Sequence, residues 1–232
     1  MTLEARSGTQ SRTAVDPVGP LATDIELVCF DLGRVLIHIC DDWEHACREA
    51  GVAVPATLHE PQRRQRVREL AIEHETGRID ADTFDRRIAD LLALSPEEAA
   101  AVCRAWLREP CPRVDELLDE VIASGVRTAC LSNTNDRHWG MMLRDERTRL
   151  PLHRLDHHFT SFTLGVMKPD PAIYEKVEAA TGVEPRRIAF FDDLPANVET
   201  ARLRGWQAHL VERSPDPVSQ IRAVLTALNV LR

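Results

Sequence analysis

The sequence predicts an α/β fold, in which a doubly wound, Rossmann-like parallel sheet core carries an inserted α-helical cap domain. Two observations support this prediction. Short apolar runs alternate with helical segments along most of the 232 residues, and this alternation is typical of a parallel sheet with helices on its faces. Between the first two runs, residues 40–113 form a stretch far longer than a crossover helix needs.

The expected strands are four apolar runs. They begin at residues 25, 126, 187 and 207 and read IELVCF, VRTACL, RIAFF and QAHLV. The helices between them are marked at their ends. Asp170 and Asp216 each precede a proline, as an N-cap residue does, and Gly125 and Gly182 stand where a helix-ending glycine belongs. The four runs should therefore be joined through helices, as in a parallel sheet.

The domain boundaries follow from these patterns. Residues 1–23 mix Ser, Thr, Gly, Pro and charge without periodicity, and we expect a disordered leader. Residues 24–39 and 114–232 form the predicted α/β core, and residues 40–113 the predicted helical cap. Within the cap, Ser95 and Glu98 form a capping box, and the apolar residues of DTFDRRIADLLAL repeat with helical spacing. The cap shows no strand-like alternation, so we expect it to be helical throughout.

The composition narrows the class of protein. The chain is 44% hydrophobic and 28% charged, as ordinary globular proteins are, and its net charge is -8. Without a clustered basic face, nucleic acid and anionic membranes are not expected partners. No apolar run approaches the roughly 18 residues that a membrane span requires, and the first 23 residues are too polar for a signal peptide. We expect a cytoplasmic protein, either a monomer or a homodimer.

Cysteine and histidine give no sign of a soft metal site. The six cysteines include no C-x-x-C pair, so neither a zinc site nor a disulfide framework is favoured. His153 and His157 are four residues apart, but they lie in a passage from loop to strand that does not hold helical spacing, and nearby Cys or Glu ligands are lacking. A surface or packing role is expected for them and for His158.

Polar residues follow the apolar runs at the points where the expected strands end. The first run ends in Asp31, the second in Ser132 and Asn133, and the third in Asp192 and Asp193, while Lys168 precedes a proline-rich turn ahead of the third run. In a parallel sheet, ligands bind beyond the carboxyl ends of the strands, so these side chains should meet at one place.

Three converging carboxylates imply a cation. Close to one another, they would repel and partly protonate unless positive charge offset them. Mg²⁺ suits an all-oxygen site that also holds waters and a phosphate. Lys168 would be a point charge in the same pocket, and Ser132 and Asn133 would donate to phosphoryl oxygens.

The ordered set of motifs resembles the haloacid dehalogenase superfamily of phosphohydrolases. The motifs read FDLG-x-VL, LSNTN, G-x-x-KP and FFDD-x-x-x-N, and the resemblance spans roughly residues 24–212. They look most like bacterial small-molecule phosphatases, including those that act on sugar phosphates. EHETGRIDADTF in the insert resembles the helical cap of that group.

The resemblance implies a role for each residue. Asp31 would be the nucleophile that takes the phosphoryl group as an aspartyl phosphate, with Lys168 and Ser132 assisting. Mg²⁺ would bind Asp31, the backbone carbonyl of Gly33 and Asp193, while Asp192 would hold a metal-bound water or orient Lys168. Phosphate would be bound by residues Ser132, Asn133, Gly33 and Arg34. The expected substrate is a small-molecule phosphate ester.

One position departs from the family pattern. Most of its phosphatases have a second aspartate two residues after the nucleophile, which exchanges protons with the leaving group and the attacking water, but this chain has Gly33 there. His38, a cap residue or the substrate would have to replace it; His74 and Trp43 also fall near the expected cap hinge or face. Two alternatives stay open: dehalogenation at carbon, and a catalytically weak or silent protein that binds or regulates.

Overall fold

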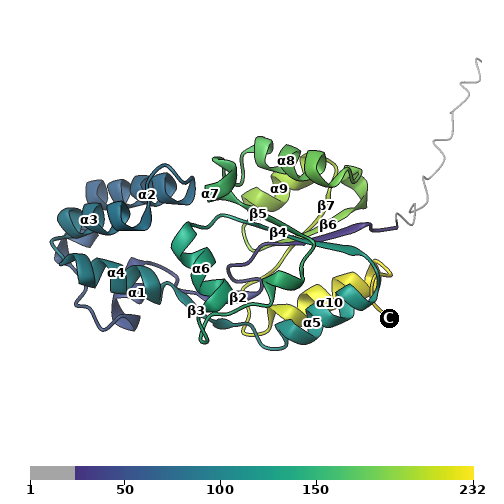
Figure 1. The fold of residues 1–232 in the computed structure, drawn as a ribbon, viewed down its shortest axis with the longest axis horizontal. Helices are drawn as coiled ribbons and strands as arrows, with labels where there is room; N and C mark the ends of the chain where they lie inside the picture. Colours follow the sequence, from purple (N-terminus) through teal and green to yellow (C-terminus); the bar gives the residue numbers. More distant parts are fainter. Residues whose placement is uncertain (1–23) are drawn as a thin grey trace, which may run out of the picture.

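A computed structural model describes residues 24–232, so the expected leader at 1–23 lies outside the described residues. The core is a five-stranded parallel sheet with the strand order β5-β4-β1-β6-β7 (Figure 1). Its strands are β1 (Leu27–Phe30), β4 (Arg127–Ser132), β5 (His157–Thr160), β6 (Ile188–Asp192) and β7 (Gln207–Leu210). The predicted doubly wound sheet is confirmed, and each of the four expected runs contains a strand.

Helices cover both faces of the sheet, with α5 and α10 on one face and α8 and α9 on the other (Figure 1). Successive residues of a strand point to opposite faces: Val28 and Phe30 of β1 pack with the first pair of helices, and Leu27 and Cys29 with the second. The helices are α5 (Val114–Ala123), α6 (Asp136–Arg144), α7 (Ser161–Leu164), α8 (Pro171–Thr181), α9 (Pro195–Leu203) and α10 (Pro217–Ala227).

The helix ends predicted at Asp170, Gly182 and Asp216 are confirmed. The side chain of Asp170 accepts a hydrogen bond from the backbone N–H of Ala172, and Gly182 ends α8 with φ 65°. Asp216 caps α10 in the same way, through the backbone N–H of Ser219. These caps satisfy N–H groups that have no partner within the helix. They fix where each helix leaves the sheet.

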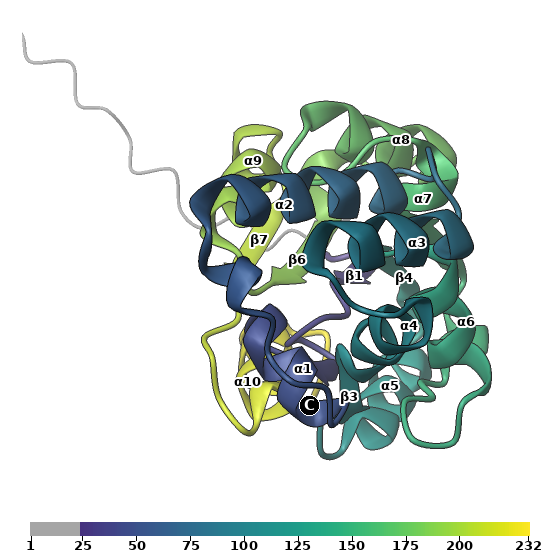
Figure 2. The same ribbon diagram turned by 90° about the vertical axis from the view of Figure 1, so that its left-hand side faces the viewer.

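The helical insert, which we define as residues 43–105, lies beyond the carboxyl ends of the strands (Figures 1 and 2). It consists of α1 (Trp43–Glu49), the 3-10 turn η1 (Ala56–His59), α2 (Pro61–Glu75), α3 (Ala81–Leu92) and α4 (Pro96–Ala105). Its own core includes Val67, Leu70, Phe84, Ile88 and Leu92. The predicted capping box of Ser95 and Glu98 is formed at the start of α4.

A two-stranded ribbon joins the insert to the core, and here the prediction that residues 40–113 contain no strand was wrong. Strand β2 (Ile37–Ile39) pairs antiparallel with β3 (Leu107–Pro110). The ribbon has three residues on one side and four on the other, including Arg108 and Glu109. Such a short pairing leaves no readable alternation of apolar and polar residues. No helix within residues 24–232 is long and apolar enough to cross a membrane.

The insert is tied to the core by side chains of α6. Arg137 donates two hydrogen bonds to the carboxylate of Asp85 on α3, at 2.7 and 2.6 Å. The Asp136 carboxylate lies 3.0 Å from Nε2 of His74 at the end of α2. Paired donors to one carboxylate fix orientation as well as distance. The insert is therefore held in one place over the strand ends.

His138 completes this attachment in a buried position. Its Nε2 donates to the backbone carbonyl of Cys103 at 2.8 Å, and its Nδ1 lies 3.1 Å from the side-chain amide of Asn135. Burial lowers the pKa of His138 to about 4, and the hydrogen bond to Cys103 opposes this shift only in part. The folded protein therefore holds His138 neutral.

We predict that the free energy of unfolding depends on pH through His138. Below pH 6.5 the unfolded chain takes up a proton at this histidine and the folded chain does not, so stability falls as the pH drops from 6.5 towards 4. The full effect is about 3 kcal/mol. Denaturant titrations across this range should show a flatter pH dependence for His138→Gln than for the wild type. The exposed His153→Gln is the control; parallel curves for His138→Gln and wild type would contradict the prediction.

Candidate active site

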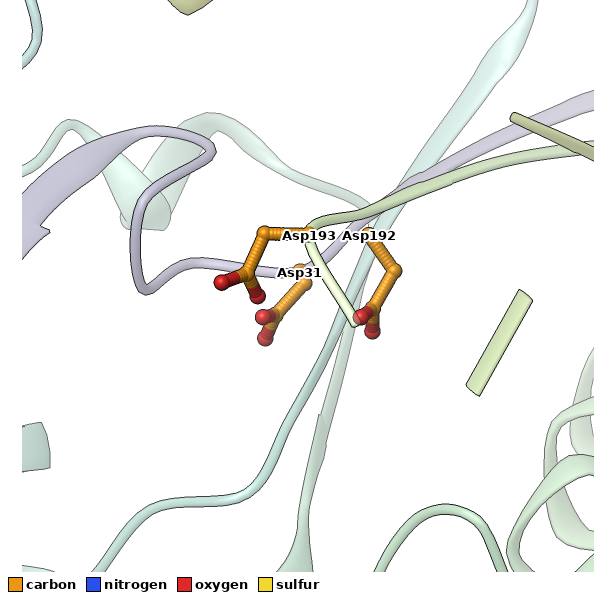
Figure 3. Close-up of side chains that lie close together, drawn as sticks. All are labelled: Asp31, Asp192 and Asp193. Carbon is orange, nitrogen blue, oxygen red and sulfur yellow. The ribbon is translucent and has the colours of Figure 1, made fainter. Parts of the chain in front are cut away.

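Three aspartates meet where two neighbouring strands end (Figure 3). Asp31 follows β1, Asp192 ends β6 and Asp193 comes next. Because Phe30 of β1 pairs in register with Phe191 of β6, the chain leaves both strands at the same level. One carboxylate oxygen from each aspartate lies within 4.8 Å of the others. The sheet thus brings together the acidic residues that the sequence predicted.

Lys168 lies among these carboxylates and is almost completely buried. Its Nζ is 2.9 Å from an oxygen of Asp31 and 2.7 Å from an oxygen of Asp192. The same ammonium donates to the backbone carbonyl of Leu131 at 2.6 Å. All three of its N–H groups therefore have an acceptor, and the ion pairs join the ends of β1, β4 and β6.

Asn133 holds the backbone of Lys168. Its Oδ1 accepts from the N–H of Lys168 at 2.8 Å, and its Nδ2 donates to the carbonyl of Lys168 at 2.9 Å. In the structure the amide of Asn133 positions the lysine, and the phosphate contact predicted for Asn133 stays a prediction. The Ser132 hydroxyl makes no hydrogen bond within residues 24–232, so it is available to a ligand oxygen.

Asp192 is the fully buried member of the acidic cluster. Besides the ion pair with Lys168, its carboxylate accepts from Nδ2 of Asn197 at 2.9 and 3.0 Å and from the backbone N–H of Leu194 at 2.8 Å. These bonds fix Asp192 as the support of Lys168. Of the two roles predicted for it, the geometry favours orienting the lysine.

Arg34 lies on the other side of the cluster. Its guanidinium donates to Asp193 at 3.4 Å and to the carbonyl of Cys40 at 3.1 Å, so it is a counter-ion here, while the predicted phosphate contact stays a prediction. The left-handed backbone of this loop falls on Arg34, with φ 59°, and not on Gly33. A Cβ at Gly33 would instead lie 3.3 Å from Cδ1 of Ile39, a tight contact.

The charges of the cluster are not balanced. Burial raises the pKa of Asp31 to about 7; Lys168 opposes the shift, and the two other aspartates add to it. Burial also raises the pKa of Asp193, with Asp192 adding to it. For Lys168, burial lowers the pKa, but the neighbouring carboxylates outweigh it and raise the pKa overall. A further cation would lower these costs, and an all-oxygen donor set fits Mg²⁺.

A cavity of about 490 Å³ lies in the helical insert and reaches α6 of the core. Apolar side chains make up much of its wall, and the polar ones include Arg64, Arg68 and Glu75. Trp43 and His74, which the sequence placed near the cap, line it, whereas His38 lies on the ribbon with its Nδ1 3.9 Å from Sγ of Cys111. The polar lining residues were not singled out from the sequence, because nothing local marks them.

The cysteines and histidines form no second metal site within the described residues. All six cysteines are free and buried. Within residues 24–232, the three aspartates form the single group of acidic, histidine or cysteine side chains close enough to share a metal. The candidate site is thus the carboxylate cluster, with the cavity of the insert beside it.

The fold and the centre define the class, a doubly wound α/β protein with a carboxylate cluster at the ends of its strands. The particular family is shown by the sequence: residues 25–204 match the model of the haloacid dehalogenase-like hydrolases, and the chain belongs to that family. The resemblance noted from the motifs is confirmed.

Several of the similar curated proteins are named as phosphatases or nucleotidases. The chain is 35% identical over 107 residues to phosphatase MT3486 of Mycobacterium tuberculosis, a match that spans 44% of this chain and 46% of that protein. It is 26% identical to the GMP/IMP nucleotidase YrfG of Escherichia coli over 83% of this chain and 85% of that protein. A magnesium complex of a haloacid dehalogenase family enzyme from Bacteroides thetaiotaomicron has the same fold, with a TM-score of 0.71, 23% identity, and coverage of 85% and 98%.

We predict that Lys168→Met lowers the free energy of unfolding by about 3 to 5 kcal/mol, because it leaves two buried carboxylates without their cation. Denaturant unfolding in the absence of divalent metal measures the loss. Lys176, the only other lysine of the sequence, is exposed on α8 and provides the matched control as Lys176→Met. Equal losses in the two variants would show that the buried ion pairs are not what holds the strand ends together.

Proposed function

We propose that the chain is a Mg²⁺-dependent phosphomonoesterase that hydrolyses a small organic phosphate, such as a sugar phosphate, through an aspartyl phosphate on Asp31. The observation that carries this proposal is the position of Asp31. It is a carboxylate at a strand end, 2.9 Å from a buried ammonium and beside two further carboxylates. A carboxylate of this kind attacks phosphorus without an activating base, and the acyl phosphate it forms reacts readily with water.

The metal would be held by Asp31, Asp193 and the backbone carbonyl of Gly33, while Asp192 orients Lys168. When bound, Mg²⁺ would offset the excess negative charge and polarise a phosphoryl oxygen. The choice of Mg²⁺ is supported by the similar enzyme from Bacteroides thetaiotaomicron, whose structure was solved as a magnesium complex.

The side chains of the chain have separable tasks in this proposal. Asp31 attacks the phosphorus atom, and Lys168, fixed by Asp192 and Asn133, neutralises charge on the phosphoryl oxygens. The free hydroxyl of Ser132 donates to another of these oxygens. The helical insert lies beyond the strand ends (Figure 2), where it would limit the access of bulk water to the reaction.

The cavity of the insert would bind the alcohol part of the substrate. The indole rings of Trp43 and Trp106 line it with their centroids 6.0 Å apart, and Asp42, Arg64 and Arg68 offer hydrogen bonds. A ring-shaped group that carries hydroxyls, as in a sugar phosphate, matches apolar walls with a few polar groups. The cytoplasmic location and the choice between monomer and homodimer stay predictions.

Dehalogenation is the weaker alternative. Its haloacid substrate carries a carboxylate, which the excess negative charge of the three aspartates would repel in the absence of metal. A catalytically silent binding protein is the other alternative, and Gly33 is its main support. Both predict no phosphate release, so one assay separates them from the proposed function.

We predict that phosphate release requires both Asp31 and a divalent metal. Asp31→Asn removes the nucleophile with little change in shape, and activity should fall by at least about 10³-fold. Phosphate release from a panel of sugar phosphates, with Mg²⁺ and then with a chelator, measures this. Glu199→Gln on the exposed side of α9 is the control and should keep full activity. Undiminished release by Asp31→Asn, or in the chelator, would contradict the proposed function.

We also predict that the cavity selects the substrate by size. Ala71→Phe places a ring in the cavity wall, and kcat/KM for a sugar phosphate should fall about tenfold or more. Acetyl phosphate, whose leaving group is small, should be hydrolysed at nearly the wild-type rate. Ala101→Phe is the matched control, because Ala101 lines a different hollow. If both variants treat the two substrates as wild type does, the cavity does not bind the substrate.

A further inference from the structure

Gly33 leaves the proposed reaction without a proton donor on the core. The leaving oxygen needs a proton when the ester bond breaks, and the attacking water must give one up later. Gly33 has no side chain, and Asp192 already accepts bonds from Lys168, Asn197 and the Leu194 N–H. If a donor is built into the chain, it comes from another element.

The nearby histidines are engaged elsewhere. His74 is bonded to Asp136 and stacked on Phe84 at 4.7 Å between ring centroids, and His138 donates to Cys103. Burial lowers the pKa of both histidines, which favours their neutral forms. His38 lies on the ribbon next to Cys111. Each of the three histidines makes these contacts outside the carboxylate cluster.

Glu75, the last residue of α2, has a different environment. It lines the cavity in which the substrate would lie. The two other acidic residues of α2 have basic partners: Glu69 is paired with Arg66, and Glu73 with Arg66 and Arg87. Glu75 forms no ion pair or hydrogen bond with any side chain in 24–232. An acidic side chain is therefore directed at the cavity with its proton-binding oxygens unused.

The contacts around Glu75 hold it close to the core. On one side, His74 is fixed to α6 by its bond to Asp136. On the other, Gly77 has φ 69° and packs against the backbone carbonyl of Phe162 on α7, so closely that a Cβ there would overlap it. Figure 1 shows this end of α2 beside α7. Two anchors within three residues leave Glu75 little freedom to move away.

We propose that Glu75 is the general acid and base of this site, supplied by the helical insert in place of the aspartate that Gly33 replaces. This inference rests on the proposed function. Burial raises the pKa of Glu75 to about 7, and the charge of Asp31 adds to this shift. A carboxyl group of this kind is suited to proton transfer near neutral pH.

Glu75 gives up one proton when the aspartyl phosphate forms and takes one back when it is hydrolysed. In the first, an oxygen of Asp31 bonds to phosphorus, the ester P–O bond breaks, and the leaving oxygen takes its proton from the Glu75 carboxyl. In the second, water bonds to phosphorus and gives a proton to the Glu75 carboxylate, while the bond between phosphorus and Asp31 breaks. The products are alcohol and phosphate, and both carboxyl groups return to their starting states.

A leaving-group comparison with Glu75→Gln tests this proposal. The variant keeps shape and polarity but has no acidic proton, so kcat/KM should fall by about 10² to 10⁴ for a sugar or alkyl phosphate. For 4-nitrophenyl phosphate, whose leaving oxygen needs no proton, the loss in the first step should be less than about tenfold. Glu73→Gln, on the same helix with its carboxylate paired outside the cavity, should leave both substrates unaffected.

The outcomes distinguish a failure of the role proposed for Glu75 from a failure of the proposed phosphatase activity. Equal losses for both substrates, or none, in a Glu75→Gln protein that melts like wild type would overturn the role of Glu75, while an inactive Asp31→Asn would leave the proposed function standing. No phosphate release by the wild type with Mg²⁺ would overturn both. Glu75→Asp, with the carboxyl group one methylene shorter, should recover part of the loss for alkyl phosphates, and Glu75→Ala should not.

Discussion

The ammonium of Lys168 between Asp31 and Asp192 is the interaction on which this structure depends. Like charges at the ends of β1 and β6 would push those strand ends apart, and burial would make the repulsion stronger than in water. Lys168 cancels it and also bonds the end of β4 through Leu131. Asn133 and Asn197 then fix the lysine and its partner. The Asp31 carboxylate is thereby kept in a defined position at the end of an otherwise apolar strand.

The same charges leave an excess of negative charge at the site. One lysine and the more distant Arg34 do not fully offset three aspartates, and burial raises the pKa of Asp31 and of Asp193. In the proposed function, Mg²⁺ would offset the remaining charge. Above the sheet, the insert is fixed through α6 by Arg137 and His138. The proposed function thus divides chemistry and substrate selection between the core and the insert, and the end of α2 packs against the core at Phe162.

Local signals were enough to predict four of the five strands of the sheet and the acidic cluster, while β5 was not among the predicted runs. Asp31 and Asp192 each end a short apolar run, and a parallel sheet brings such ends together whatever the details of packing. The β2–β3 ribbon could not be predicted, because its pairing is too short to show a period. The bonds of the Asn133 amide to the backbone of Lys168 could not be predicted either, because the two residues are thirty-five positions apart in sequence. Glu75 could not be singled out among three acids of one helix until the docking of the insert was known.

In the proposed function the phosphoryl group is transferred to Asp31. The most direct measurement is therefore to detect a phosphoryl group on Asp31 during turnover. The protein with Mg²⁺ and a sugar phosphate would be quenched in acid during turnover, digested, and analysed by peptide mass spectrometry. We expect a phosphoryl group on the peptide that contains Asp31, present during turnover and absent once the substrate is exhausted. Steady release of phosphate while that peptide stays unmodified, or a phosphoryl group on another residue, would contradict the claim.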